Sequence, residues 1–182
     1  LQMSMITLGG MVLQSVLNGF GVVFVAGYTA ANKLYGILES ASVAFGYAMT
    51  AYMGQNRGAR NAARIDAGIR AVLVLSAEFT AAIVTAMLLA GKPLLGLFLS
   101  TEEAGAADAL AVAYQYLMVL MAFLFALFML QAYRSSLQGL GEMTVPTLSG
   151  FAEMLMRMGA ALVLPIFIGQ SGVFFAEGAA WV

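Results

Sequence analysis

Long apolar stretches follow one another along this chain of 182 residues and constrain its fold more than any other feature. A helix that crosses a bilayer needs about 20 mainly apolar residues, whereas a membrane-crossing strand needs about 9–11. Five stretches reach the helical length, and a sixth begins near the C-terminus. They cover about residues 1–20, 23–53, 68–90, 112–133 and 147–168, with the sixth starting at about residue 172. We therefore predict an all-α membrane protein, a polytopic bundle of transmembrane helices.

The composition supports a lipid environment for this bundle. Hydrophobic residues make up 62% of the chain and charged residues only 9%. Soluble domains have about 45–50% apolar and about 25% charged residues, because their surfaces must face water. Side chains that face lipid have no such requirement, so we predict the lipid bilayer as a partner. The formal net charge of −1 gives no indication of a nucleic-acid partner.

The residues needed for common enzyme chemistry are missing, since the chain contains no cysteine and no histidine. This excludes Cys/His zinc sites, cysteine nucleophiles and histidine general bases. The glycine-rich stretches GQNRGA and QGLGEM lack the strand context and the lysine/serine pattern of phosphate-binding loops. We therefore predict that the protein is not an enzyme and has no catalytic residues, no metal site and no cofactor.

The charges between the predicted spans indicate their orientation. The connection QNRGARNAARIDAGIR, between the second and third spans, carries four arginines and one acid, Asp66. The connection after the third span carries Lys92 and three acids, and the fourth span is followed by Arg134 and a turn rich in glycine and serine. Because positive charge marks the cytoplasmic side, we predict that the first and third of these connections are cytoplasmic.

Two acids in the predicted spans are candidates for function, because an ionisable group inside a membrane is costly and needs a reason. Glu39 lies on the order of 20 Å from the cytoplasmic end of the second span, at 1.5 Å per residue. Asn32, Glu39 and Gly46 are seven residues apart and therefore share one helix face. We propose Glu39 and Asn32 for substrate contact or cation coupling, with Glu78 of the third span as a second acid. Each acid could instead only hold helices together.

The first span has no ionisable residue but carries a stripe of polar side chains, Thr7, Gln14 and Asn18. We expect them either to line a water-accessible cavity or to join helices. In the fifth span, the i, i+4 spacing of Glu153 and Arg157 predicts an ion pair within one helix.

Small residues at a spacing of four in the second span, Gly36, Ser40 and Ala44, predict close packing against another helix.

Four segments in the same order resemble the multidrug and toxic compound extrusion (MATE) family of transporters. AMTAYMGQNRGARNAARIDAGIRA resembles the family's cytoplasmic loop after its eighth helix, and LQMSMITLGGMVLQSVLNGFG is similar to its seventh helix. GKPLLGLFLSTEE is similar to the stretch before the tenth helix, and YRSSLQGLGEMTVPTLSG to the loop between the tenth and eleventh helices. The set covers nearly the whole chain.

The resemblance implies that residues 1–182 are the C-terminal transmembrane lobe of a two-lobe transporter, comprising helices seven to eleven and the start of helix twelve. The chain would then require the missing N-terminal lobe to enclose a cavity. The family exports small organic cations, drugs and amphipathic compounds in exchange for H⁺ or Na⁺ by alternating access. We therefore expect a secondary antiporter with a small-molecule substrate, located in the inner (plasma) membrane as a multi-pass protein.

The chain departs from the family at one point, because some sodium-coupled members carry acids on their seventh and tenth helices. The corresponding spans, residues 1–20 and 112–133, contain none, so that cation site does not carry over. Two alternatives remain open at this point. One is an exporter of lipid-linked saccharides from the same superfamily, and the other is a membrane scaffold that transports nothing.

Overall fold

The computed structural model describes the backbone of residues 2–99 and 105–182, and side chains in these ranges from Thr7 onward. Every regular element in the described ranges is a helix. The α-helices are α1 (Gln2–Leu17), α2 (Val22–Gly58), α3 (Ala62–Gly96), α4 (Ala106–Gly139), α5 (Thr144–Ile168) and α6 (Phe174–Trp181), with the 3₁₀ helix η1 (Gly169–Val173) between α5 and α6. The predicted all-α class is confirmed.

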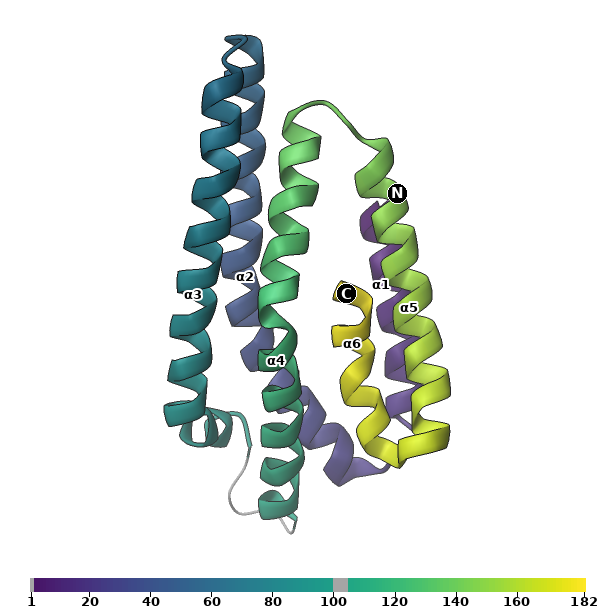
Figure 1. Cartoon of the computed structure of the whole chain (residues 1–182). Coiled ribbons are helices and arrows are strands. Elements are labelled where there is room, and N and C mark those ends of the chain that lie inside the picture. Colours follow the sequence, from purple (N-terminus) through teal and green to yellow (C-terminus); the bar gives the residue numbers. More distant parts are fainter. Residues whose placement is uncertain (1, 100–104) are drawn as a thin grey trace.

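The helices pack as two groups that meet at α4 (Figure 1). In one group α2 packs along α4, and α3 lies against both. In the other, α1 lies along α5, while α6 packs on α5 and reaches α4. The turn between α2 and α3 and the turn between α4 and α5 lie at the same end of the bundle, as the predicted alternation of spans requires (Figure 1).

The core is centred on α4, whose inner face is fully buried at Tyr116, Leu117, Leu120 and Leu124. An aromatic stack joins this face to both groups of helices. Tyr28 of α2 stacks on Tyr116 with a centroid distance of 4.3 Å, and Phe174 of α6 stacks on Tyr116 at 5.3 Å. The Tyr116 hydroxyl donates a 3.0 Å hydrogen bond to the Tyr28 hydroxyl, which satisfies both polar groups inside the core.

Three segments are long and apolar enough to cross a membrane: Ala62–Gly96, Ala106–Gly139 and Thr144–Trp181. The predicted spans at 1–20 and 23–53 are also helical, but they fall short by this measure. The described apolar part of the first is only Thr7–Leu17. The second contains Lys33, Glu39 and other polar side chains. The count of five full spans stays a prediction.

The helices extend beyond the predicted spans, so several residues that the sequence assigns to connections are helical. Lys92 lies inside α3, and most of the basic connection belongs to α2 or α3. Arg134 was expected in the connection after the fourth span, but α4 continues to Gly139, so Arg134 and the serines that follow it are helical and buried. The physical reason is that polar side chains end an apolar pattern without ending a helix, provided that they find partners. Glu102 and Glu103 of the acidic connection lie outside the described residues.

The expected close-packing stripe of α2 was also wrong. Gly36, Ser40 and Ala44 are exposed, and a Cβ atom at Gly36 would have no atom within 4 Å. The close approach of α2 and α4 occurs instead at Gly27, where a Cβ atom would collide with the carbonyl oxygen of Ala109. Small residues spaced four apart identify a smooth helix face but not the element that packs against it. Here the face with Gly36 borders a cavity.

The turn before α5 is held by Glu142. Gly141 takes a left-handed φ of 76°, which brings the Glu142 carboxylate under the first turn of α5. It accepts hydrogen bonds from the backbone N–H groups of Thr144 at 2.7 Å and Val145 at 3.4 Å. The hydrogen bond from the Thr144 backbone is the main cause of the lowered pKa of Glu142.

We predict that Gly27→Ala destabilises the protein while Gly36→Ala does not. The added methyl at residue 27 overpacks the α2–α4 contact, which typically costs about 1–3 kcal/mol. The methyl at residue 36 enters open space and removes a helical glycine, which stabilises by roughly 0.5–1 kcal/mol. Chemical unfolding of both purified variants in detergent measures the difference. Equal stabilities would contradict the close contact of α2 and α4.

We also predict that Glu142→Ala increases fraying of the first turn of α5 at neutral pH but not in acid. The folded pKa lies below the ordinary value of 4.5, so the carboxylate stabilises the turn fully above that value. The effect is lost as the pH falls through the lowered folded pKa. Amide exchange protection at Thr144 and Val145 in the two proteins, followed from neutral to acid pH, measures it. A difference that persists unchanged in strong acid would disprove the role of the charge.

Candidate functional site

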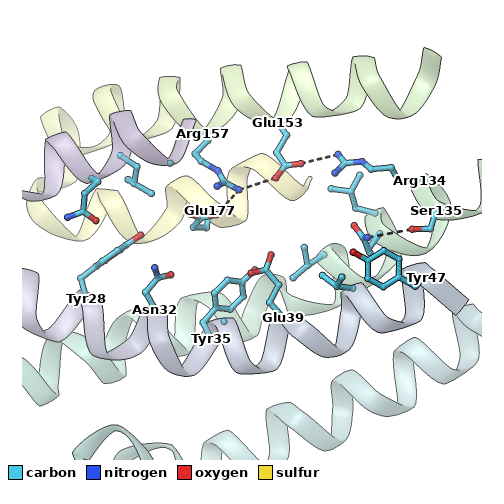
Figure 2. Close-up of a pocket in the computed structure, with 18 of the residues that line it drawn as sticks. Tyr28, Asn32, Tyr35, Glu39, Tyr47, Arg134, Ser135, Glu153, Arg157 and Glu177 are labelled. Carbon is cyan, nitrogen blue, oxygen red and sulfur yellow. Dashed lines mark hydrogen bonds and ion pairs between the residues drawn. The ribbon is translucent and has the colours of Figure 1, made fainter. Parts of the chain in front are cut away.

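A cavity of about 440 Å³ lies between the two groups of helices and is the candidate functional site. Its walls come from α1, α2, α4, α5 and α6, while α3 contributes no lining residue. The α1 side and parts of α2 and α4 are apolar, with leucines and Val43. The remaining wall carries the charged and amide side chains drawn in Figure 2. Most of the lining residues are polar or charged, so the cavity combines a polar wall with a smaller apolar one.

The α2 wall presents Asn32, Tyr35 and Glu39 to this cavity (Figure 2). Tyr35 and Glu39 are one helical turn apart, and the phenol of Tyr35 lies beside the Glu39 carboxylate, within hydrogen-bonding reach. Asn32 and Glu39 are seven residues apart, which places them on one helix face, as the spacing predicts. Glu39 is half-buried and forms no ion pair with any residue that the structure describes.

The opposite wall is built around a chain of ion pairs that we term the α4–α6 ion network: Arg134, Glu153, Arg157 and Glu177. Arg134 of α4 contacts one oxygen of Glu153 of α5 at 3.0 Å. Arg157, one turn further along α5, contacts the other oxygen of Glu153, also at 3.0 Å. The same Arg157 nitrogen contacts Glu177 of α6 at 2.8 Å, so charges alternate across three helices (Figure 2).

The network is mostly hidden from solvent, which determines how it can behave. Arg134 and Glu153 are 7% and 6% exposed, and Arg134 also donates a 2.7 Å hydrogen bond to the hydroxyl of Ser149. Charges removed from water are tolerated only when opposite charges and hydrogen bonds replace the lost hydration. With two guanidinium groups and two carboxylates, the network is electrically neutral. It joins α4, α5 and α6 in the present arrangement.

The charge balance of the whole cavity is then one negative charge in excess. Its lining includes three carboxylates and two guanidinium groups, and the network pairs all of them except Glu39. A half-buried carboxylate without an ion-pair partner, next to the phenol of Tyr35, attracts a positive group. The arrangement can therefore bind a cation that also has apolar surface.

The structure separates the site residues predicted from the sequence into two sets. Glu39, Asn32 and Gln14 line the cavity. Asn18, in the turn directly after α1, is exposed and accepts a 3.1 Å hydrogen bond from the Gln14 side chain, but it is not part of the lining. Thr7, near the other end of α1, and Glu78, exposed on α3, also lie outside the lining.

Sequence reasoning identified the Glu153–Arg157 pair but missed that it is the middle of a longer network. The pair is confirmed, since both residues lie on α5 at the predicted spacing. The sequence pattern places Arg134 in a connection and gives no indication of a role for Glu177. Their partners belong to other helices, so no local spacing could reveal them. The available signal was that Glu153, Arg157 and Glu177 fall inside predicted apolar segments and need partners.

Comparison with known proteins was made for both sequence and fold. The sequence profile of the MatE family matches residues 1–163 of the chain. A comparison with curated proteins finds no match.

Several solved structures have the same fold as this chain. A crystal structure of a mutant MATE protein superposes with a TM-score of 0.89 at 19% identity, covering 99% of this chain and 40% of that chain. An outward-facing multidrug resistance MATE family transporter of the MOP superfamily superposes with a TM-score of 0.89 at 20% identity. The match covers 99% of this chain and 39% of that chain. A MOP superfamily transporter from Pyrococcus furiosus gives 0.84 at 19% identity, again covering 99% and 39%. The chain thus spans about 40% of the length of these structures.

We predict that Glu153→Gln strongly destabilises the protein, because it leaves Arg134 and Arg157 without their shared carboxylate. Breaking a buried ion pair by removing one partner typically costs about 3–5 kcal/mol. Glu78→Gln is the matched control: Glu78 is exposed and forms no ion pair with the described residues, so the change leaves no buried charge without a partner and should not destabilise the protein. Unfolding of both variants in the same detergent measures the difference. An unfolding midpoint for Glu153→Gln equal to that of the control would show that the network contributes nothing to stability.

Proposed function

The chain belongs to the MatE family of membrane transporters, and from this premise we propose that it forms part of a secondary active antiporter. The transporter exports small organic cations, drugs or amphipathic metabolites in exchange for H⁺ or Na⁺. The observation that carries the proposal is the unpaired carboxylate of Glu39 in a cavity of about 440 Å³. We place the protein in the inner (plasma) membrane.

Glu39 has the central role in this proposal. A carboxylate can couple two fluxes when the exported cation and the inward-moving ion compete for it. Both are positive, so binding of one displaces the other and the cavity never carries a large net charge. Asn32, on the same face of α2, donates or accepts hydrogen bonds to orient the bound compound. Gln14 extends the polar lining to α1, and Thr7 and Asn18 continue its polar stripe outside the present cavity.

A second lobe completes the transport path in this proposal. The superpositions cover 99% of this chain but only about 40% of the solved transporters that share its fold. Alternating access requires one lobe or bundle to move against another around a central site. We propose that an N-terminal lobe forms the other wall of the cavity. The Arg134–Glu153–Arg157 part of the ion network then keeps α4 and α5 together during the movement.

The exporter of lipid-linked saccharides is the weaker alternative on electrostatic grounds. Such a compound carries phosphates, and the two guanidinium groups in the cavity would be its natural partners. Both are already paired with Glu153 or Glu177, and the remaining charge is negative. A polyanion would have to displace those carboxylates, whereas an organic cation finds Glu39 available.

We predict gradient-driven dye uptake into inverted membrane vesicles that contain the full-length protein, with H⁺ and Na⁺ gradients imposed separately. Ethidium is a suitable dye because it combines a positive charge with aromatic surface. Movement under either gradient supports antiport and identifies the coupling ion. The absence of movement under both gradients, with folded protein present, would contradict the proposal. Uptake of a labelled lipid-linked saccharide would then favour the alternative.

Glu39→Gln should reduce this transport by about tenfold or more, since a hydrogen bond to a charged group contributes roughly 1.5–3 kcal/mol. Glu78→Gln also removes one intramembrane carboxylate, but from outside the cavity, and should retain transport. If Glu39→Gln transports normally with unchanged dependence on both ions, Glu39 has no coupling role.

A further inference from the structure

Arg157 uses its guanidinium group in an unusual way. Both of its ion pairs, to Glu153 at 3.0 Å and to Glu177 at 2.8 Å, are made by the single nitrogen Nη2. Its Nε atom is buried without a hydrogen-bond partner in the part of the chain that the structure describes. A guanidinium has five N–H donors, so Arg157 retains unused capacity to bind an acceptor. An unpaired buried donor is costly, which favours an alternative arrangement in which it finds one.

The carboxylate of the cavity that forms no ion pair with the described residues is Glu39, on the opposite wall. Figure 2 shows its carboxylate directed across the cavity toward Arg157 and Glu177. Arg157 is also the cation whose charge acts favourably on Glu39. Arg134 is not a competitor for this role, because Glu153 and Ser149 hold it on the far side of the network. Arg157 thus stands between two carboxylates, Glu177 on α6 and Glu39 on α2.

We propose that Arg157 is a tethered competitor for the cation that binds Glu39, and that Glu177 controls it. In the present structure Glu177 holds Arg157 away, and Glu39 is open to an incoming cation. When α6 moves away from α5, the Arg157–Glu177 contact breaks and Arg157 turns to Glu39, displacing the cation. This inference rests on the proposed function and adds to it the step that releases the bound cation.

The position of the contact suits this role. Glu177 is the residue through which α6 joins the network. Its contact with Arg157 is therefore an ionic link between α5 and α6. α6 is joined to α5 through the 3₁₀ helix η1 rather than through a continuous α-helix. A break in helical geometry of this kind often marks a hinge. Movement of α6 would therefore change the partner of Arg157 without disturbing the Arg134–Glu153 pair.

The alternative hypothesis is that Glu177 affects cation binding only through its own charge. A double-mutant cycle distinguishes this alternative from the proposal. If Glu177 acts only through its own charge, removing it weakens cation binding by the same factor whether or not Arg157 is present. If Glu177 acts by holding Arg157, its removal matters only while Arg157 is there. The test is therefore the difference between two fold-changes and not the size of either one.

The experiment measures equilibrium binding of tetraphenylphosphonium to the purified full-length protein. Glu177→Gln should weaken binding by about tenfold, equivalent to about 1.4 kcal/mol. In the Arg157→Gln background the same substitution should change the affinity by less than about twofold, within the usual error of additivity. Equal fold-changes in the two backgrounds overturn the inference.

Glu177→Asp provides a second test that preserves the charge and is less disruptive to folding. The shorter side chain withdraws the carboxylate from Arg157, so we expect weaker binding, and again only when Arg157 is present. Unchanged affinity in Glu177→Asp overturns the inference. If the unsubstituted protein neither binds tetraphenylphosphonium nor moves dye under any gradient, the proposed function itself fails, and the inference falls with it. If the unsubstituted protein binds tetraphenylphosphonium but the effects of the Glu177 and Arg157 substitutions are additive, only the inference about Arg157 is overturned.

Discussion

Charges that are buried in a membrane protein must be paired, and this requirement organises the structure around the ion network of α4, α5 and α6. Arg134, Glu153, Arg157 and Glu177 come from three helices, and none of them can leave the network without leaving a charge uncompensated in a poorly hydrated space. Dispersion contacts between lipid-facing helices would allow many relative rotations. Alternating charges at 2.8–3.0 Å allow few, so the network selects one arrangement of these helices.

The same network explains why a cavity persists between two well-packed groups of helices. α2, α3 and α4 share an extensive apolar core, while α1 packs mainly along α5. Between the groups, α4 and α5 touch little, and their link is largely the ionic contact of Arg134 with Glu153. Long charged side chains hold helices apart as well as together. The space that they leave is lined by amides, phenols and carboxylates, and one of these carboxylates is unpaired.

Much of the fold could be predicted from the sequence, because apolar runs of membrane length form helices almost regardless of their partners. Helix ends were less predictable, since Arg134 ends the apolar run but not the helix. For the site, the seven-residue spacing placed Asn32 and Glu39 on one helix face. It could not show that Glu39 is a better candidate for function than Glu78. Both are lone acids near the middle of a predicted span. Only the position of α3 outside the cavity distinguishes them, and that position depends on packing between helices distant in sequence. The partners of Arg157 were hidden for the same reason.

An antiporter needs a site whose affinity for its cation differs between the states that face each side of the membrane. A fixed carboxylate alone does not provide this, because a ligand that binds both states equally shifts no equilibrium. A charged side chain that belongs to the protein can provide it, if helix movement changes which carboxylate it neutralises. The cavity carries three carboxylates for two guanidinium groups. In our proposal, the position of α6 relative to α5 determines whether Glu39 is left to a mobile cation or is neutralised by Arg157.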